Sequence, residues 1–317
     1  MFAQSVGGFL LFYFLSFALV MGCNDWFLVW VGLEINMMSF IALIYERGAL
    51  GVEMCLKYFF IQSLGSGVLM MMFYSEFKWV EYLSLVILSY KIGGGPFYFW
   101  FPSICDGLSW GSCFMLMTIQ KVLPLILITF LVSMFLWVII FSSMLIGGVG
   151  SMNQKSMKRL LAFSSIHHIG WILLGHFISN TMWMIYLMVY TLLILGVIWM
   201  LMSDKILEIG MLGKISSKWS FVLGMMSMGG MPPLLGFYLK WWMFYNIMTI
   251  DKSLLIVMLM MSVLMFYVYF RVVYFIIMGG SSTCSWGPTR MSKIKLNFDS
   301  IYILGPNVGV VVWLFNS

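Results

Sequence analysis

Apolar stretches of about 20 residues, the length that an α-helix needs to cross a bilayer, follow one another along almost the whole chain. Hydrophobic residues make up 62% of the 317 residues, charged residues only 9%, and the mean hydropathy is +1.02. A soluble domain usually carries about a quarter charged residues, so these side chains could not cover a surface exposed to water. The sequence therefore predicts an all-α, polytopic integral membrane protein.

The links between the stretches are short, which favours a single membrane domain over residues 1–317. We predict about 11 transmembrane helices, each long enough to span the bilayer. Their expected ranges are 4–22, 26–45, 54–74, 82–103, 109–128, 130–149, 157–177, 181–202, 217–247, 253–278 and 300–315.

Basic residues gather on alternate links. Links after even-numbered spans, together with the first residues of the span that follows, hold ten of them: Arg47, Lys155, Lys158, Arg159, Lys205, Lys214, Lys218, Arg290, Lys293 and Lys295. Links after odd-numbered spans hold two, Lys78 and Lys252. The positive-inside rule then places the N-terminus on the positive side of the membrane and the C-terminus on the opposite side. Because the basic residues are scattered between apolar spans, we expect no nucleic-acid partner.

Two long spans are interrupted by glycine and proline. The breaks are expected at Gly93, Gly94, Gly95 and Pro96, and at Gly229, Gly230, Pro232 and Pro233, because proline removes a backbone donor and clashes with the preceding turn. The two spans are five helices apart and so would cross in opposite directions. Paired broken helices in inverted repeats mark the transport site of many transporters. We predict antiporter-like repeats of five helices at about 4–128 and 130–278, followed by a C-terminal helix at about 300–315.

Four charged residues lie deep inside predicted spans: Glu34, Lys91, Lys121 and Lys240. Each costs about 2.5–3.5 kcal/mol at the centre of a helix, even on the more forgiving insertion scale. We expect them to face the interior and to form a proton relay, because burial disfavours the charged form of both Lys and Glu. Ion pairs that only hold helices together are the alternative interpretation.

Other polar residues are weaker candidates. Lys57 and Arg271 lie near the positive side, where a long side chain can reach the interface. His168 could extend the relay with support from Ser164 and Ser165, although a packed, neutral His168 fits the sequence equally well. The cysteines Cys23, Cys55, Cys105, Cys113 and Cys284 show no paired spacing. We find no catalytic, nucleotide or metal motif, so we expect no catalytic residue, cofactor or metal in this chain.

Several motifs resemble, in order, the chain 2 family of mitochondrial NADH:ubiquinone oxidoreductase, respiratory complex I. They are Trp30–Phe40, Lys57–Phe59, Pro96–Pro102, Gln120–Pro124, Asn153–Trp171 and Gly229–Trp241. The family is similar to Na⁺/H⁺ antiporter subunits. The resemblance implies proton translocation, while NADH, FMN, iron–sulfur clusters and ubiquinone belong to other subunits. It also implies the mitochondrial inner membrane, with membrane-arm and accessory subunits and phospholipid as partners.

The resemblance assigns roles residue by residue. Glu34 matches the buried glutamate, Lys91 its partner in the broken helix, Lys121 the lysine of the central axis, and Lys240 the second broken-helix lysine toward the exit. The chain departs from many relatives at Tyr98, where they carry His, and at Ser103, where they carry an acid. Both departures leave open how protons reach Lys91.

Two other functions are compatible with parts of this sequence. The inverted repeat alone would allow a stand-alone cation/proton antiporter, although no carboxylate pair suited to Na⁺ is evident. A structural scaffold is disfavoured by the buried charges.

The charge pattern generates a topology prediction. We expect the N-terminus in the matrix and the C-terminus in the intermembrane space, because ten basic residues lie on one set of links and two on the other. Labelling of tags at each end in intact and permeabilised mitoplasts measures this. Access to both tags from the same side would refute the span count.

Overall fold

The computed structural model describes residues 2–23, 25–46, 48–75, 79–179, 181–215, 217–248 and 252–279. Within these ranges the chain forms α-helices and short 3₁₀ helices, and its β-structure is one isolated antiparallel bridge between Ser156 and Glu208. The all-α prediction is confirmed for this part of the chain. The expected helix at 300–315, and Arg47, Lys78, Arg290, Lys293 and Lys295 of the charge pattern, lie outside it.

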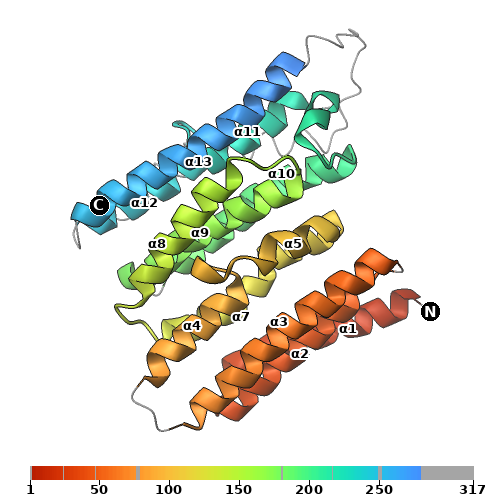
Figure 1. Ribbon diagram of the computed structural model, residues 1–317, viewed down its shortest axis with the longest axis vertical. Helices are drawn as coiled ribbons and strands as arrows, with labels where there is room; N and C mark the ends of the chain where they lie inside the picture. Colours follow the sequence, from red (N-terminus) through yellow and green to blue (C-terminus); the bar gives the residue numbers. More distant parts are fainter. Residues whose placement is uncertain are drawn as a thin grey trace. The chain divides into compact units, whose positions relative to one another are not determined.

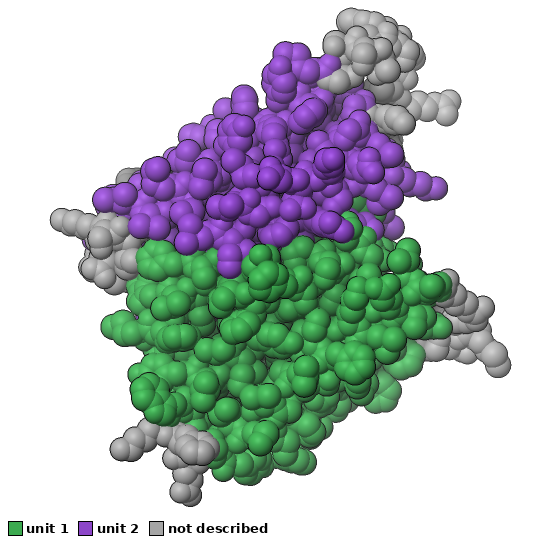
Figure 2. Space-filling view, in the orientation of Figure 1, with its two compact units in different colours: residues 1–143 green, residues 144–317 purple. Residues whose placement is uncertain are grey.

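The chain divides into two compact units, residues 1–143 and 144–317 (Figure 2). Unit 1 contains α1 Phe2–Gly22, α2 Trp26–Ile44, α3 Ala49–Phe73, α4 Val80–Ile92, η1 Gly95–Phe97, α5 Trp100–Gly107, α6 Trp110–Met117, η2 Ile119–Lys121 and α7 Val122–Thr129. The boundary falls inside α8 Leu136–Ser151. Unit 2 continues with α9 Met157–Ile178, α10 Met182–Ser203, η3 Ile209–Lys214, α11 Lys218–Gly229, α12 Leu235–Met248 and α13 Lys252–Gly279.

In unit 1, α2 packs between α1 and α3, and α3 also contacts α4 and α5 (Figure 1). In unit 2, α13 lies along α11 and α12, while α9 packs on α10 and α12. In the most apolar stretch of α9, 89% of the residues are buried, whereas in that of α3 the share of buried residues is 28%. The helix α9 is therefore the centre of unit 2, and α3 presents much of its surface outward.

Six of the described helices are long and apolar enough to cross a membrane by length and composition. They cover Trp26–Ile44, Ala49–Phe73, Trp110–Thr129, Met157–Ile178, Met182–Ser203 and Leu255–Met278. Two shorter apolar helices cover Gly7–Gly22 and Leu136–Ser151. The chain is thus a multi-pass membrane protein. The full count of 11 spans and the inverted relation of the two repeats stay predictions.

The interruptions predicted in spans 82–103 and 217–247 are present, since α4 ends at Ile92 and α11 at Gly229. The predicted span 109–128 is present as the apolar stretch Trp110–Thr129, but it is not one continuous helix, because it divides into α6, η2 and α7. Its backbone leaves helical geometry at Thr118, with φ −122° and ψ −79°. Pro124 also lacks the N–H that a continuous helix would donate to residue 120. The largest boundary differences are that α3 begins at Ala49 rather than 54 and α8 at Leu136 rather than 130.

Glycine brings α8 against α9 inside unit 2. A Cβ atom on Gly147 would lie 2.5 Å from the backbone N and 2.8 Å from the Cα of His167. Lipid chains are as apolar as leucine side chains, so membrane helices associate largely through such close packing of small residues.

We predict that Gly147→Ala destabilises the protein by about 1–3 kcal/mol, as overpacking of a tight interior usually does. Gly148→Ala is the matched control, because its Cβ would meet only the Leu264 side chain at 3.9 Å. The measurement is the thermal unfolding of each variant in membranes. Equal melting temperatures would show that α8 can move away from α9 at no cost.

Candidate functional site

Both broken helices end in the same backbone motif. At the end of α4, Gly93 donates to the Tyr90 carbonyl (3.1 Å) and Gly94 to the Ser89 carbonyl (2.9 Å). At the end of α11, Gly230 donates to Ser227 O and Met231 to Met226 O, both at 3.1 Å. This pair of bonds is the Schellman motif, which requires a left-handed residue. Gly93 (φ +73°) and Gly230 (φ +82°) supply it.

Lys91 lies in the last turn of α4, where the partial negative charge of the helix end favours a cation. Lys91 is 6% exposed. The Gln62 side chain of α3 donates to the Lys91 carbonyl (3.0 Å) and so satisfies one of the acceptors that the break leaves open. A Cβ on Gly65 would lie 3.0 Å from Lys91 Cγ and Cε, so the lysine side chain runs directly over this glycine.

Glu34 of α2 reaches the same part of α3. The Ser66 hydroxyl donates to the Glu34 carboxylate, and Ser66 follows directly after the glycine that Lys91 covers. Glu34 is close enough to Lys91 to interact electrostatically. In the described structure, however, the two groups make no direct ion pair within 4 Å. Two consecutive residues of α3, Gly65 and Ser66, therefore contact Lys91 and Glu34 respectively.

Lys121 belongs to η2, at the interruption between α6 and α7, and is 1% exposed. Lys91 and Lys121 line one cavity with about 20 Å³ of space for the centres of water molecules. A single water needs about 10–15 Å³ on this measure, so the cavity can hold one. Its other polar lining residues are Asn36, Tyr58, Gln62 and Gln120. The Gln120 amide nitrogen is buried without a hydrogen-bond partner, which a water in this cavity would satisfy.

In unit 2, Lys240 of α12 lies beside the break that ends α11. Its ammonium donates to the carbonyls of Gly229 (2.8 Å) and Met228 (3.3 Å), which end α11, and the residue is 5% exposed. A Cβ on Gly230 would lie 2.9 Å from Lys240 Cδ, so the left-handed glycine also gives the lysine room. In sequence order, Lys91 thus comes before the helix break at Gly93, whereas Lys240 comes after the helix break at Gly230.

The two adjacent histidines of α9 differ in their hydrogen-bond partners. Trp171 Nε1 donates to His167 Nε2 (3.2 Å), and His167 Nδ1 lies 3.5 Å from the Met144 carbonyl. An indole nitrogen only donates and a carbonyl only accepts, so His167 is neutral with its proton on Nδ1. His168 Nδ1 instead lies 2.8 Å from the Tyr186 hydroxyl, a group that can both donate and accept. Between the two, only His168 has a partner suited to relaying a proton.

Comparison with known proteins identifies the family. Residues 70–268 match the family described as "NADH:quinone oxidoreductase/Mrp antiporter, TM". The NADH-ubiquinone oxidoreductase chain 2 of Anopheles gambiae is 38% identical over 250 residues, which cover 72% of this chain and 73% of that protein. The Aedes aegypti protein of the same name is 35% identical and covers 74% of each chain.

The chain belongs to the NADH-ubiquinone oxidoreductase chain 2 family.

Solved structures show the same fold at lower identity. A chain of respiratory complex I from Thermus thermophilus with bound aureothin has a TM-score of 0.81 at 23% identity, covering 96% of this chain and 78% of that one. A chain of the Mrp complex from Dietzia sp. DQ12-45-1b has a TM-score of 0.70 at 19% identity, covering 78% of this chain and 56% of that one.

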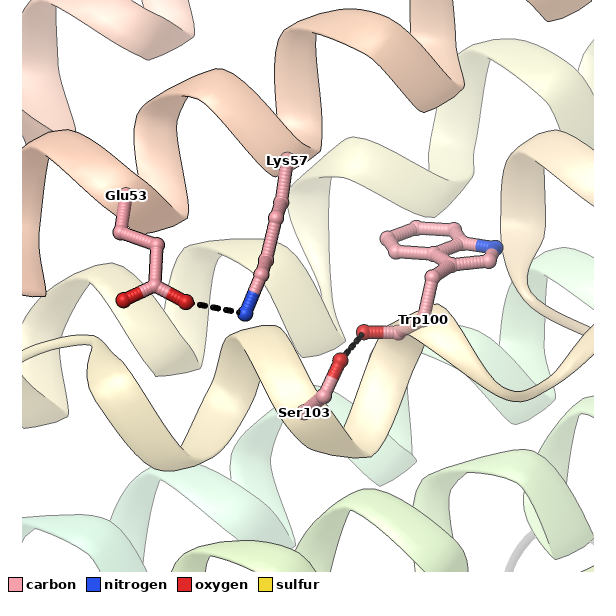
Figure 3. A network of polar contacts seen from close by, with 4 residues as sticks. All are labelled: Glu53, Lys57, Trp100 and Ser103. Carbon is pink, nitrogen blue, oxygen red and sulfur yellow. Dashed lines mark hydrogen bonds and ion pairs between the residues drawn. The ribbon is translucent and has the colours of Figure 1, made fainter.

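For this member of the chain 2 family, the structure brings Glu34, Lys91 and Lys121 together in unit 1 and leaves Lys57 apart. Lys57 forms an ion pair with Glu53 (2.5 Å) on an outward-facing part of α3, with side-chain exposures of 45% and 51% (Figure 3). This pair fits the interpretation that Lys57 reaches the interface.

Other polar side chains noted in the sequence donate hydrogen bonds to backbone carbonyls. Ser103 donates to the Trp100 carbonyl (2.7 Å; Figure 3), and Arg271 to the Met152 carbonyl beyond the end of α8. The hydroxyls of Ser164 and Ser165 donate to Leu161 O and Ala162 O, one turn earlier in α9.

Sequence reasoning missed four residues at the site: Gln62, Ser66, Gln120 and Phe101. The first three are polar residues inside apolar spans, and that signal could have singled them out. Phe101 is one of 28 phenylalanines. It lies in the motif Pro96–Pro102, but nothing in the sequence indicates that its ring meets Lys121.

The contact of Gly65 with Lys91 generates a structural prediction. Gly65→Val should displace the Lys91 side chain from the cavity, because even one added carbon lies within about 3.0 Å of it. Gly67→Val, two residues further along α3, is the control, since its Cβ has no neighbour within 4 Å. Electron cryo-microscopy of both variants decides the matter: an unmoved Lys91 in Gly65→Val would contradict the close contact.

Proposed function

We propose that this chain is a membrane-arm subunit of mitochondrial NADH:ubiquinone oxidoreductase, and that it translocates protons through Glu34, Lys91, Lys121 and Lys240. Family membership supports the subunit assignment. The observation that carries the relay is the polar cavity lined by both Lys91 and Lys121 beside a broken helix. A cavity that holds water between two amines offers a path for a proton, and a packed apolar core does not.

Within unit 1 the proposed step is a proton transfer from one lysine to the other. The ammonium of Lys91 gives a proton to a water in the cavity, and that water gives one to the neutral amine of Lys121. Glu34 and the end of α4 stabilise the positive charge on Lys91 before the transfer. Gln62 and Gln120 line the cavity and can orient the water with their amide groups.

Within unit 2 the proposed carrier is Lys240. The last carbonyls of a helix have no intrahelical partner, and the two that end α11 accept hydrogen bonds from the Lys240 ammonium. His168 with Tyr186 is the candidate extension of this path, with Ser164 and Ser165 in supporting positions on the same helix. His167, bonded on both nitrogens as a neutral ring, is outside it.

The remaining parts of the proposal concern the assembly. We place NADH, FMN, the iron–sulfur clusters and ubiquinone on other subunits, and the chain in the inner membrane with its N-terminus in the matrix. Its partners are other membrane-arm and accessory subunits and phospholipid. The family description also names the Mrp antiporter, so a stand-alone cation/proton antiporter is kept as the second candidate. A native gel separates the two, because only the first predicts a large assembly with NADH dehydrogenase activity.

The relay predicts that Lys121→Met or Lys240→Met lowers proton-translocating quinone reduction by roughly tenfold or more, because a positioned proton-transfer group typically contributes a factor of at least about 100. Methionine has a similar length but cannot carry a proton. NADH oxidation by an artificial acceptor, which bypasses the membrane arm, should continue at the wild-type rate. Proton uptake and quinone reduction in membrane vesicles measure both activities.

The control for this pair is Lys57→Met, which removes an exposed lysine that has a partner on its own helix. We expect it to pump normally. Wild-type proton yield in Lys121→Met or Lys240→Met, in a complex that assembles fully, would show that the lysine concerned is structural.

A further inference from the structure

The Lys121 ammonium lies over an aromatic ring. Its nitrogen is 5.0 Å from the centroid of the Phe101 ring, and both residues are 1% exposed. Cations interact favourably with the face of an aromatic ring within about 6 Å, and the interaction strengthens where water is excluded. A neutral amine has no such attraction, so the ring distinguishes the two states of the lysine.

The broken helix fixes the position of this ring. A Cβ on Gly93 would lie 2.9 Å from Phe101 Cβ and 3.1 Å from Cδ2, so the left-handed glycine that ends α4 also packs directly on Phe101. The neighbouring Trp100 Nε1 donates to the Tyr90 carbonyl (3.1 Å) in the last turn of α4. The start of α5 is thereby held against the end of α4, with the Phe101 ring turned toward η2.

The other titratable groups around Lys121 come from several helices. Tyr58 of α3 and Lys91 of α4 line the same cavity, and Cys105 of α5 and Cys113 of α6 lie within electrostatic range. Thiols and phenols are largely neutral near pH 7. Glu34 of α2 lies beside Lys91, and its neighbours Leu33 and Asn36 line the cavity. Among these groups, protonated Lys91 carries the same charge as the Lys121 ammonium and repels it. The Phe101 ring supplies a fixed attraction at the Lys121 ammonium itself.

We propose that Phe101 is a positioning residue that sets the proton affinity of Lys121 by stabilising its ammonium form through the face of the ring. This inference rests on the proposed role of Lys121 in proton transfer. The inference gives the broken helix a second function besides carrying Lys91, because Gly93, which ends α4, packs on Phe101 and so positions its ring. A movement of α5 relative to η2 would change how strongly Lys121 holds its proton.

The test compares Phe101→Leu and Phe101→Met, which lack a ring, with Phe101→Tyr, which keeps one. The control is Phe99→Leu, because Phe99 is 73% exposed on the same broken helix. Proton translocation is measured against pH in vesicles that contain the assembled complex. Without the ring, Lys121 loses its proton more easily, so the alkaline limb of the profile should move to lower pH by about one unit. Phe101→Tyr and Phe99→Leu should keep the wild-type profile.

An unshifted profile in Phe101→Leu and Phe101→Met overturns the inference, and so does an equal shift in Phe101→Tyr, which would reveal an effect of packing alone. If Phe101→Tyr does not assemble on a native gel, the two ringless variants are compared with each other. Phe101→Leu and Phe101→Met differ in shape but both lack the ring, so equal shifts support the inference and unequal shifts overturn it. The proposed function fails separately: normal pumping by Lys121→Met would refute the relay. Lost pumping in Lys121→Met with an unshifted Phe101→Leu profile would refute only the role of Phe101.

Discussion

A charged lysine inside a bilayer needs polar atoms around it, and in this fold the interrupted helices supply them. Lipid offers no hydrogen bonds, so the carbonyls that a helix break leaves open must find donors within the protein. Lys240 donates to two of the carbonyls that end α11, and Gln62 donates to the Lys91 carbonyl at the end of α4. The breaks and the buried polar groups therefore stabilise one another, and removing either would leave the other without a partner.

Glycine allows this arrangement in two separate ways. At Gly93 and Gly230 it adopts the left-handed backbone that ends each helix, while at Gly65 it gives space to a lysine side chain. At Gly236 a Cβ would lie 1.7 Å from the Ser227 carbonyl oxygen, so α12 can return along α11 only with glycine there. That close return is what brings Lys240 back to the end of α11. In a protein whose outer surface is as apolar as its interior, such close contacts largely determine which helices pack together.

The sequence predicted the apolar helices and both breaks, because hydropathy and Gly/Pro clusters act locally. It also singled out the three lysines that the structure buries. It did not predict which residues surround them, because Ser66 meets Glu34 and Phe101 meets Lys121 through contacts between separate helices. The interruption at Thr118 was missed because threonine is common inside helices and Pro124 lies six residues further on. Lipid-facing and packed surfaces are both apolar here, so hydropathy could not show that α9 is enclosed and α3 exposed.

The two broken helices solve the same electrostatic problem differently. Lys240 follows its break, so its side chain can reach back to the terminal carbonyls of α11, which are fixed backbone dipoles. Lys91 precedes its break and runs over Gly65 toward a hydratable cavity, with Glu34 held nearby by Ser66. A fixed dipole keeps the same strength in every step, whereas a carboxylate can gain or lose a proton and a water can reorient. The charge on Lys91 is therefore the one whose stabilisation can change with the protonation of Glu34 or the orientation of a water, and Lys240 has the more constant environment.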